Sequence, residues 1–245
     1  MDPQSISFFD FITSTITNLF SDTNEREPLE REILAIKSLR VKIKNVDAEE
    51  VTNSLNTINL NTIEKFREIG FQSDNPISDI RAAGLLGIEQ LIYFLKHKKI
   101  ESQNIIQKRK NRDNGKNYPV AAIGMNITHF IATEFYIVDK FGRFPEFKTI
   151  NTNYFKFLED DNVDINVNDT CKFIKYHELY CESFILLDYL FEKKGREGGD
   201  NDQNGKYLDM PYVLDDFKNI FKKLINDSSG SIEEFVRLRS DLMTN

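Results

Sequence analysis

The chain has 245 residues, with 32 Lys and Arg against 39 Asp and Glu, and 40% of its residues are hydrophobic. A chain of this length and composition buries a core without disulfide or metal cross-links. Its net charge of −7 argues against general nucleic-acid binding, which needs a basic surface. No segment reaches the ~20 apolar residues of a membrane span.

The cysteines and both ends of the chain predict a cytoplasmic protein. Cys171 and Cys181 lie in one helical pattern. At the rise of an α-helix they would be ~15 Å apart, which is too far for a disulfide, and reduced thiols are typical of the cytosol. Residues 1–20 lack the basic start and cleavage site of a secretory signal. Asp2 excludes N-myristoylation, and residues 242–245 are not a prenylation box.

Apolar residues at helical spacing begin near the start of the chain. Over residues 5–20 they predict an amphipathic helix that packs on the core. The alternative is a helix that docks on a membrane surface or a partner, although its polar face lacks the Lys and Arg that membrane-surface helices favour. The same spacing predicts three further helices, over residues 29–41, 47–55 and 57–69.

Residues 66–95 organise the middle of the chain. Gly70 ends the preceding helical pattern, as glycine does just past a last turn. Residues 74–76 read Asp-Asn-Pro, which favours a turn, and Ser78 or Asp79 can cap a new helix. That helix carries apolar residues at helical spacing: Leu85, Leu86, Ile88, Leu91, Ile92 and Leu95.

Two features of this helix oppose its local preferences. Arg81 stands in the first turn, where the helix dipole disfavours a cation. Gly84 and Gly87 each cost about 1 kcal/mol of helix propensity relative to Ala, which makes sense if another backbone comes very close. Arg81 has two interpretations. It is either a surface arginine paired with Asp79 or Glu68, or an arginine held at a helix start to meet an anion.

The stretch over residues 96–116 is basic. One interpretation is a solvated connector; the other is an electrostatic patch that faces an anionic membrane or an acidic GTPase surface. Only Glu101 and Asp113 oppose its cations, which are Lys96, Lys98, Lys99, Lys108, Arg109, Lys110, Arg112 and Lys116.

The second half of the chain is also helical in pattern. Pro119 opens a helix over residues 120–141 that is apolar on most faces and therefore buried. A short aromatic helix over residues 147–158 follows, and an acidic loop over 159–169. Further helices are expected over 171–193, 207–224 and 231–242, the last beginning with a capping box at Ser231.

No metal or nucleotide site emerges from the sequence. Residues 200–205 imitate the start of a calcium loop, but Pro211 stands where its final Glu should be. His97, His129 and His177 are scattered, and Cys171, His177 and Cys181 are too few for a zinc site. The chain has no phosphate-cradling Gly-Lys-Ser loop. We therefore expect no cofactor and no metal.

The central motifs resemble those of a known family. Gly70-Phe71-Gln72, Asn75-Pro76, Ser78-Asp79-Ile80-Arg81 and Gly84-Leu85-Leu86-Gly87 are similar, in this order, to the signature of the ELMO (engulfment and cell motility) domain. Tyr118, Pro119, Ala121, Gly124, Asn126 and Ile127 resemble its Tyr-Pro-x-Ala-x-x-Gly-x-Asn-Ile motif. The resemblance spans about residues 60–140 and extends less firmly to about 225.

The helical patterns and the resemblance together predict an all-α protein with a single compact multi-helix domain of the ELMO type. We expect an N-terminal helical region over residues 1–56 that packs on the core, the ELMO domain over 57–227, and a C-terminal helix over 228–245. Three residues depart from the family pattern. Ile80 replaces its Phe, Ala82 its Gly, and Phe66 its Trp.

The resemblance also implies a function. The chain looks like a stand-alone ELMO protein of the ELMOD group, which are GTPase-activating proteins for the GTP-bound forms of Arf and Arl GTPases. It implies that Arg81 is the catalytic arginine, supplied in trans, while the chain has no chemistry of its own. An arginine carries a fixed charge that suits the transition state of phosphoryl transfer. Gln72 and Asp79 are candidates for orienting it.

Four more residues of the signature are candidates for partner binding: Gly70, Phe71, Pro76 and Ser78. The alternative function is a non-catalytic adaptor in which Arg81 is structural. Larger ELMO proteins are scaffolds that work with DOCK-type exchange factors on Rac, in engulfment and cell migration. In either case the partners expected are small GTPases or their regulators, with peripheral membrane contact through residues 96–116.

Overall fold

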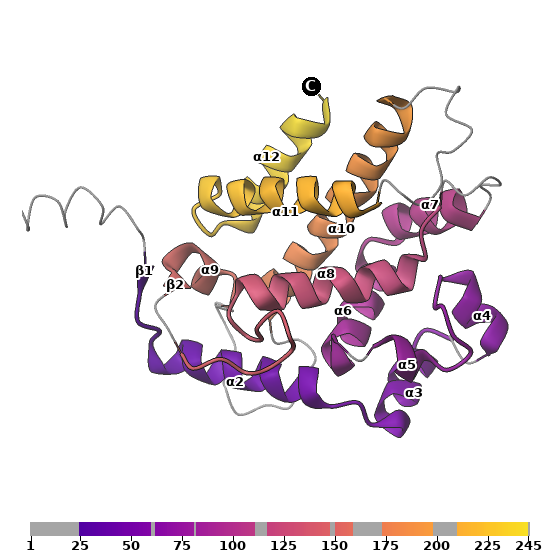
Figure 1. Cartoon of the computed structure of the whole chain (residues 1–245), viewed down its shortest axis with the longest axis horizontal. Helices are drawn as coiled ribbons and strands as arrows, with labels where there is room; N and C mark the ends of the chain where they lie inside the picture. The colour runs from indigo at the N-terminus through magenta and orange to yellow at the C-terminus, as the bar shows by residue number, and fades with distance from the viewer. Residues whose placement is uncertain are drawn as a thin grey trace, which may run out of the picture.

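The computed structural model describes residues 25–59, 62–80, 82–110, 117–147, 150–158, 173–197 and 210–244 (Figure 1). Its helices are α2 (Glu30–Lys44), α3 (Ala48–Asn56), α4 (Ile63–Glu68), α5 (Pro76–Asp79), α6 (Gly84–His97), α7 (Lys99–Lys110), α8 (Val120–Glu134), α9 (Thr152–Lys156), α10 (Ile174–Glu197), α11 (Met210–Asp227) and α12 (Ile232–Thr244). The prediction of an all-α protein is confirmed. Within the described ranges, the strands are two-residue segments, β1 (Glu25–Arg26) and β2 (Ile150–Asn151), paired antiparallel.

Helices α6, α8 and α10 form the centre of the fold. In Figure 1, α2 lies along one side of them, and α11 and α12 along the other. Helix α6 is buried nearly all round because two hydrophobic clusters meet on it. Leu86 and Phe94 belong to the larger cluster, which extends over α8, α10 and α11. Leu85, Ile88 and Leu91 belong to a smaller cluster, which lies under α3 and the segment between α4 and α6.

Gly84 lets the end of α2 cross the start of α6. Its φ is +56°, and an added Cβ would overlap the carbonyl of Ile43. The amide of Leu85 donates to the carbonyl of Asn45 over 2.9 Å. The expectation that another backbone comes close is therefore confirmed for Gly84. For Gly87 it is wrong, because the space belongs to side chains: an added Cβ would lie 2.6 Å from Sδ of Met125.

Replacing Gly84 with Ala is expected to destabilise the fold by about 2–4 kcal/mol, because a left-handed backbone and a backbone contact both oppose a methyl group. The matched control is Gly195→Ala in α10, where an added Cβ meets nothing within 4 Å. There the gain in helix propensity should stabilise by about 0.5–1 kcal/mol. Urea unfolding of the two variants measures both effects, and equal midpoints would contradict the close crossing.

Three helix boundaries differ from the prediction because turns take over. The helix expected from Ser78 or Asp79 begins instead at Gly84, after the separate four-residue α5, which Asn75 caps and Pro76 opens. The helix expected over 57–69 begins at Ile63, with Thr62 as its N-cap. The helix expected over 120–141 ends at Glu134, where Tyr136 takes a φ of +54°.

The structure also tests the predictions for the basic stretch, for residues 147–158 and for the cap at Ser231. The basic stretch is not a connector over its described part, because residues 99–110 form α7. Residues 147–158 hold β2 and the short α9 rather than one helix. Ser231 accepts a hydrogen bond from the amide of Glu234, as the sequence predicts, and Asp47 caps α3. The helix expected over 5–20, the loop over 159–169, residues 200–205 and Cys171 lie outside the described residues.

Candidate functional site

Asp79 is the centre of the turn between α4 and α6. Its Oδ2 accepts hydrogen bonds from the amides of Gln72, over 2.6 Å, and Ser73, over 3.3 Å. Its Oδ1 lies 3.3 Å from the hydroxyl oxygens of Ser73 and Ser78. A single carboxylate therefore fixes residues 72 and 73 against α5. Of the two predicted orienting residues, Asp79 holds the backbone of the other, Gln72.

The remaining contacts of this turn are local caps. The side chain of Asn75 accepts from the amide of Ile77 over 3.1 Å, which caps α5. The hydroxyls of Ser73 and Ser78 contact each other, and both donate to the carbonyl of Asn75. Pro76, at the first position of α5, is buried. The turn is thus tied together by short polar side chains with little freedom.

Gly70 and Phe71 dock this turn on the start of α8. The carbonyl of Ile69 accepts from the amide of Ala121 over 2.9 Å, so the turn satisfies a donor that the first turn of a helix leaves free. Gly70 has a φ of +84°, and an added Cβ would overlap the amide of Val120. Phe71 is buried edge-on against Phe66, with ring centroids 6.0 Å apart.

Among the predicted partner-binding residues, the buried Phe71 and Pro76 therefore pack inside the protein. Gln72 is exposed, and Ser78 is half-buried. Gly70 and Gln72 line a hollow of about 630 Å³ together with Tyr118 and Pro119 of the second motif. The hollow also has walls from α4 and α7: Glu64, Arg67, Glu68, Ile106, Arg109 and Lys110. The two motifs of the sequence signature thus meet at one place on the surface.

Arg81, the predicted catalytic residue, lies outside the described residues, but its neighbours on both sides are described. Ile80 is fully buried in the smaller hydrophobic cluster, and Ala83 is buried with it. The carbonyl of Ile80 accepts from the amides of Ala83, over 2.9 Å, and Gly84, over 2.6 Å. Ala82 is exposed. The chain is therefore anchored immediately before and after position 81.

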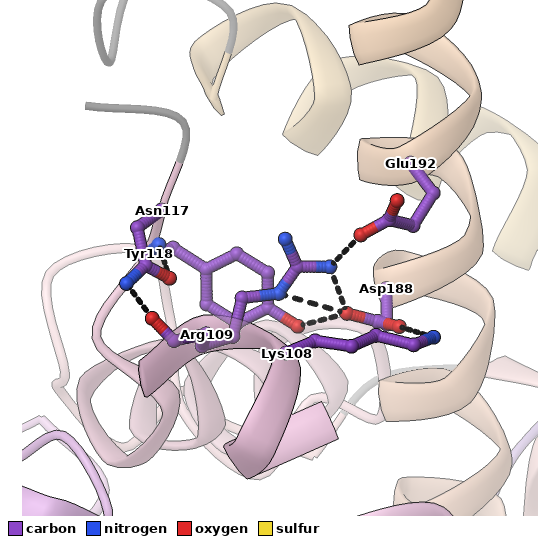
Figure 2. Close-up of polar contacts among 6 residues, drawn as sticks. All are labelled: Lys108, Arg109, Asn117, Tyr118, Asp188 and Glu192. Atoms are coloured by element: carbon purple, nitrogen blue, oxygen red, sulfur yellow. Dashed lines mark hydrogen bonds and ion pairs between the residues drawn. The ribbon is translucent and has the colours of Figure 1, made fainter. Parts of the chain in front are cut away.

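Arg109 forms a buried ion-pair network that the sequence analysis missed (Figure 2). Only 2% of its surface is exposed. Its Nη2 lies 2.5 Å from Oδ1 of Asp188 and 2.5 Å from Oε1 of Glu192, both on α10. The guanidinium lies over the rings of both Tyr118 and Phe191, 4.6 and 4.7 Å from their centroids, and the two rings themselves pack edge to face. This network fastens α7 and the segment before α8 to α10.

The hydroxyl of Tyr118 completes the network by donating to Oδ1 of Asp188 over 2.7 Å. Burial and the neighbouring charge of Asp188 raise the pKa of Tyr118 well above its ordinary value, so the phenol remains a neutral donor at neutral pH. The amide of the Asn117 side chain donates to the carbonyl of Arg109. Tyr118, part of the second signature motif, thus has a structural role beside the hollow.

A sequence model described as the ELMO/CED-12 family matches residues 31–204. The chain belongs to this family. It is 23% identical over 227 residues to ELMO domain-containing protein A of Dictyostelium discoideum, a match that covers 90% of this chain and 21% of that protein. It is 29% identical over 179 residues to ELMO domain-containing protein C of the same organism, covering 73% and 25%.

Human ELMO domain-containing protein 2 is 34% identical over 71 residues, which are 29% of this chain and 24% of that protein. The chain thus spans about a quarter of the length of these curated relatives. No solved structure matches it.

The departures of this ELMO chain from the signature lie at different depths. Ile80, in place of the usual Phe, is fully buried in the smaller cluster. Phe66, in place of Trp, packs half-buried against that cluster. Ala82, in place of Gly, is exposed. The first two changes are therefore absorbed by the core, whereas the third adds a methyl group to the surface beside position 81.

Several cations of the basic stretch form ion pairs with carboxylates of this same ELMO protein. Lys98 Nζ lies 2.9 Å from carboxylates of both Glu178 and Glu182. Although burial opposes it, these hydrogen bonds raise the pKa of Lys98 above its ordinary value. Lys110 pairs with Glu68 over 3.1 Å. The described part of residues 96–116 therefore offers less free charge to a membrane than its composition indicates.

The rings of His97 and His177 both stack on the ring of Tyr93, at centroid distances of 4.2 and 5.1 Å. In the part of the chain that the structure describes, no three His, Cys, Asp or Glu side chains are grouped to hold a metal ion. None of the described helices is long and apolar enough to cross a membrane.

Replacing Asp79 with Ala is expected to free the amides of Gln72 and Ser73 and to cost about 1–2 kcal/mol of stability, as removal of a charged acceptor does. Hydrogen exchange of these two amides measures the effect directly. The matched control is Asp74→Ala in the same turn, whose pair with Arg67 is exposed on both sides, so we expect a change below about 0.5 kcal/mol. Unchanged exchange in Asp79→Ala would contradict the role given to this carboxylate.

Proposed function

We propose that this ELMO/CED-12 chain is a GTPase-activating protein for small GTPases of the Arf and Arl families. Arg81 supplies a guanidinium in trans to the nucleotide of the GTP-bound partner. The observation that supports this proposal best is the anchoring of the chain on both sides of position 81, through the buried Ile80 and through the amides of Ala83 and Gly84.

Such anchoring matters because of how phosphoryl transfer is catalysed. Negative charge spreads over the transferred phosphoryl group in the transition state, and catalysis is almost entirely positioning and electrostatic stabilisation. A flexible arginine would lose most of its effect to the entropy of finding the right position. A turn fixed by Asp79 and by the start of α8 provides a rigid base for it.

Described residues that precede and follow position 81 in the sequence offer exposed surface to a partner. Gln72 and Ala82 are exposed, and the hollow next to Gln72 has a mixed lining with Arg67 and Glu64. A GTPase could place part of its switch surface there, because a non-obligate interface is no more apolar than the rest of a protein surface. In this proposal Gln72 contacts the GTPase, and Asp79 acts through the turn.

The second candidate is a non-catalytic adaptor that binds a small-GTPase regulator such as a DOCK-type exchange factor. One observation favours it. Ala82 is exposed where the family signature has Gly, and its methyl group narrows the approach of a GTPase to position 81. Binding would then use the same surface, but no arginine would reach the nucleotide.

Single-turnover GTP hydrolysis by a panel of Arf and Arl GTPases, with this protein in excess, separates the two candidates. Stimulation that is lost in Arg81→Lys supports the activating function. Stimulation that survives this change removes Arg81 from the catalytic role. Binding to a GTP-loaded partner without stimulation favours the adaptor.

A further inference from the structure

Exposed aromatic and basic side chains form a patch on α2 and on the segment that follows α8, outside the turn of the proposed site. The segment after α8 turns back along α2 (Figure 1). It exposes Phe141, Phe144 and Phe147, whose side chains are 69%, 42% and 36% accessible. Lys37 of α2 lies 6.0 Å from the ring of Phe147, and on the same helix face as Lys37 the residues Leu34 and Val41 are exposed. We call these five residues, with Lys37, Arg40, Lys140 and Arg143, the aromatic–basic patch.

The cations of the patch lie over its rings. The guanidinium of Arg40 is 4.6 Å from the centroid of Phe147 and 5.6 Å from that of Phe144. The guanidinium of Arg143 and the ammonium nitrogen of Lys140 lie 4.9 and 5.0 Å from the centroid of Phe141. Each exposed ring thus has a positive charge at its face.

Arg40 also fixes the segment to α2. Its Nε donates to the carbonyl of Ile137 over 2.9 Å, and its Nη2 to those of Tyr136, over 3.1 Å, and Pro145, over 2.7 Å. The tip is closed by Asp139, whose Oδ1 accepts from the amides of Phe141 and Arg143 over 2.8 and 2.9 Å. The patch is therefore formed in advance of any partner.

The charge of the patch is opposite to that of the whole protein. Its four cations face two carboxylates on the same segment, Asp139 and Glu146, although the chain carries a net charge of −7. Asp139 is already engaged by Arg143 over 2.7 Å. Among the described residues, Lys37 and Lys140 have no carboxylate partner, in contrast to Lys98, Lys108 and Lys110 of the basic stretch.

We propose that the aromatic–basic patch docks on an anionic phospholipid surface. Side chains of Phe and Leu beside Lys and Arg are typical of protein surfaces that lie at the headgroup boundary, with the rings among the acyl ends and the cations at the phosphates. A lipid surface also needs no matching pocket. The proposal is independent of GTPase activation, because neither the patch nor its test involves Arg81.

Flotation of the full chain with phosphatidylcholine vesicles, with and without phosphatidylserine, tests this inference. We expect binding to rise about tenfold with the anionic lipid and to fall as salt screens the cations. The double variant Phe141→Ser/Phe144→Ser should bind at least about tenfold more weakly. The matched control Tyr212→Ser removes an equally exposed aromatic side chain, on α11, and should change nothing.

A charge variant, Lys37→Gln/Lys140→Gln, should retain the fold and lose the dependence on phosphatidylserine. Circular dichroism of each variant shows whether it is folded. Equal flotation with both kinds of vesicle, or none with either, would overturn the proposal. So would a concentration-dependent dimer in sedimentation that Phe141→Ser/Phe144→Ser abolishes without any vesicle binding, because the patch would then join two copies of the chain.

Discussion

Replacing Arg81 with Lys is expected to slow GTP hydrolysis on the bound Arf or Arl partner by about 10³–10⁵-fold, which is the effect of a trans arginine in GTPase activation. The change keeps a positive charge but removes the planar fork that contacts two oxygens at once. The loss corresponds to about 4–7 kcal/mol of the activation barrier. Single-turnover hydrolysis with saturating protein measures it.

Affinity should separate from rate in this variant. If the guanidinium acts mainly in the transition state, the Kd for the GTPase bound to a non-hydrolysable GTP analogue should change by less than about threefold. The matched control is Arg67→Lys, an exposed arginine at the neighbouring hollow that pairs with Asp74 over 2.5 Å. It should lower the rate by less than about threefold. A rate within tenfold of wild type for Arg81→Lys would contradict the proposal.

The parts of the fold that sequence predicts well are those with local causes. Helical spacing of apolar residues identifies the central helices, and the cap at Ser231 comes from chemistry within four residues. The two oddly placed glycines also signal close contacts. At Gly84 the neighbour is the backbone of α2, whereas at Gly87 it is the side chain of Met125.

The parts that fail depend on residues far apart in the chain. The stretch after residue 96 has a composition typical of a solvated connector. It forms α7 because Ile105 and Ser102 are buried against the core and because Arg109 meets Asp188, 79 positions later. No local pattern pairs these two residues. The signal that the sequence does offer for this network is Tyr118 in the second signature motif, whose hydroxyl donates to the carboxylate of Asp188.

The site shows the same division. The signature places Gly70, Gln72 and Asp79 in one turn, and the structure brings them together through the backbone amide of Gln72. The sequence does not reveal that Phe71 and Pro76 are buried, because apolar residues at a predicted interface and in a core look alike. Nor does it show that residues 117–120 complete the hollow, since that contact depends on how α8 packs.

Replacing Asp188 with Ala is expected to destabilise the protein by about 3–5 kcal/mol, because removal of one partner leaves a buried charge poorly compensated. Arg109 would keep Glu192 but lose its contacts through Nε and Nη2 with Asp188, and Tyr118 would lose its acceptor. Urea unfolding at neutral pH measures the change. The matched control is Asp241→Ala, whose pair with Arg237 is exposed on both sides and should contribute below about 0.5 kcal/mol.

A double-mutant cycle with Arg109→Met tests whether the two residues act as a pair. In the background of Asp188→Ala, the further loss of Arg109 should cost at least about 2 kcal/mol less than it does in the wild-type protein. Additive effects would mean that the guanidinium is stabilised chiefly by Glu192 and by the rings of Tyr118 and Phe191 instead.

The same variant connects the core with the proposed site. Asp188 accepts a hydrogen bond from the hydroxyl of Tyr118, and α8 begins two residues after Tyr118. The amide of Ala121, in the first turn of α8, donates to the carbonyl of Ile69 in the turn. Loosening Tyr118 should therefore increase hydrogen exchange at Ala121 more than at Glu134, at the far end of α8. If exchange rises equally along the helix, the network supports the fold as a whole and has no particular connection to the turn that precedes Arg81.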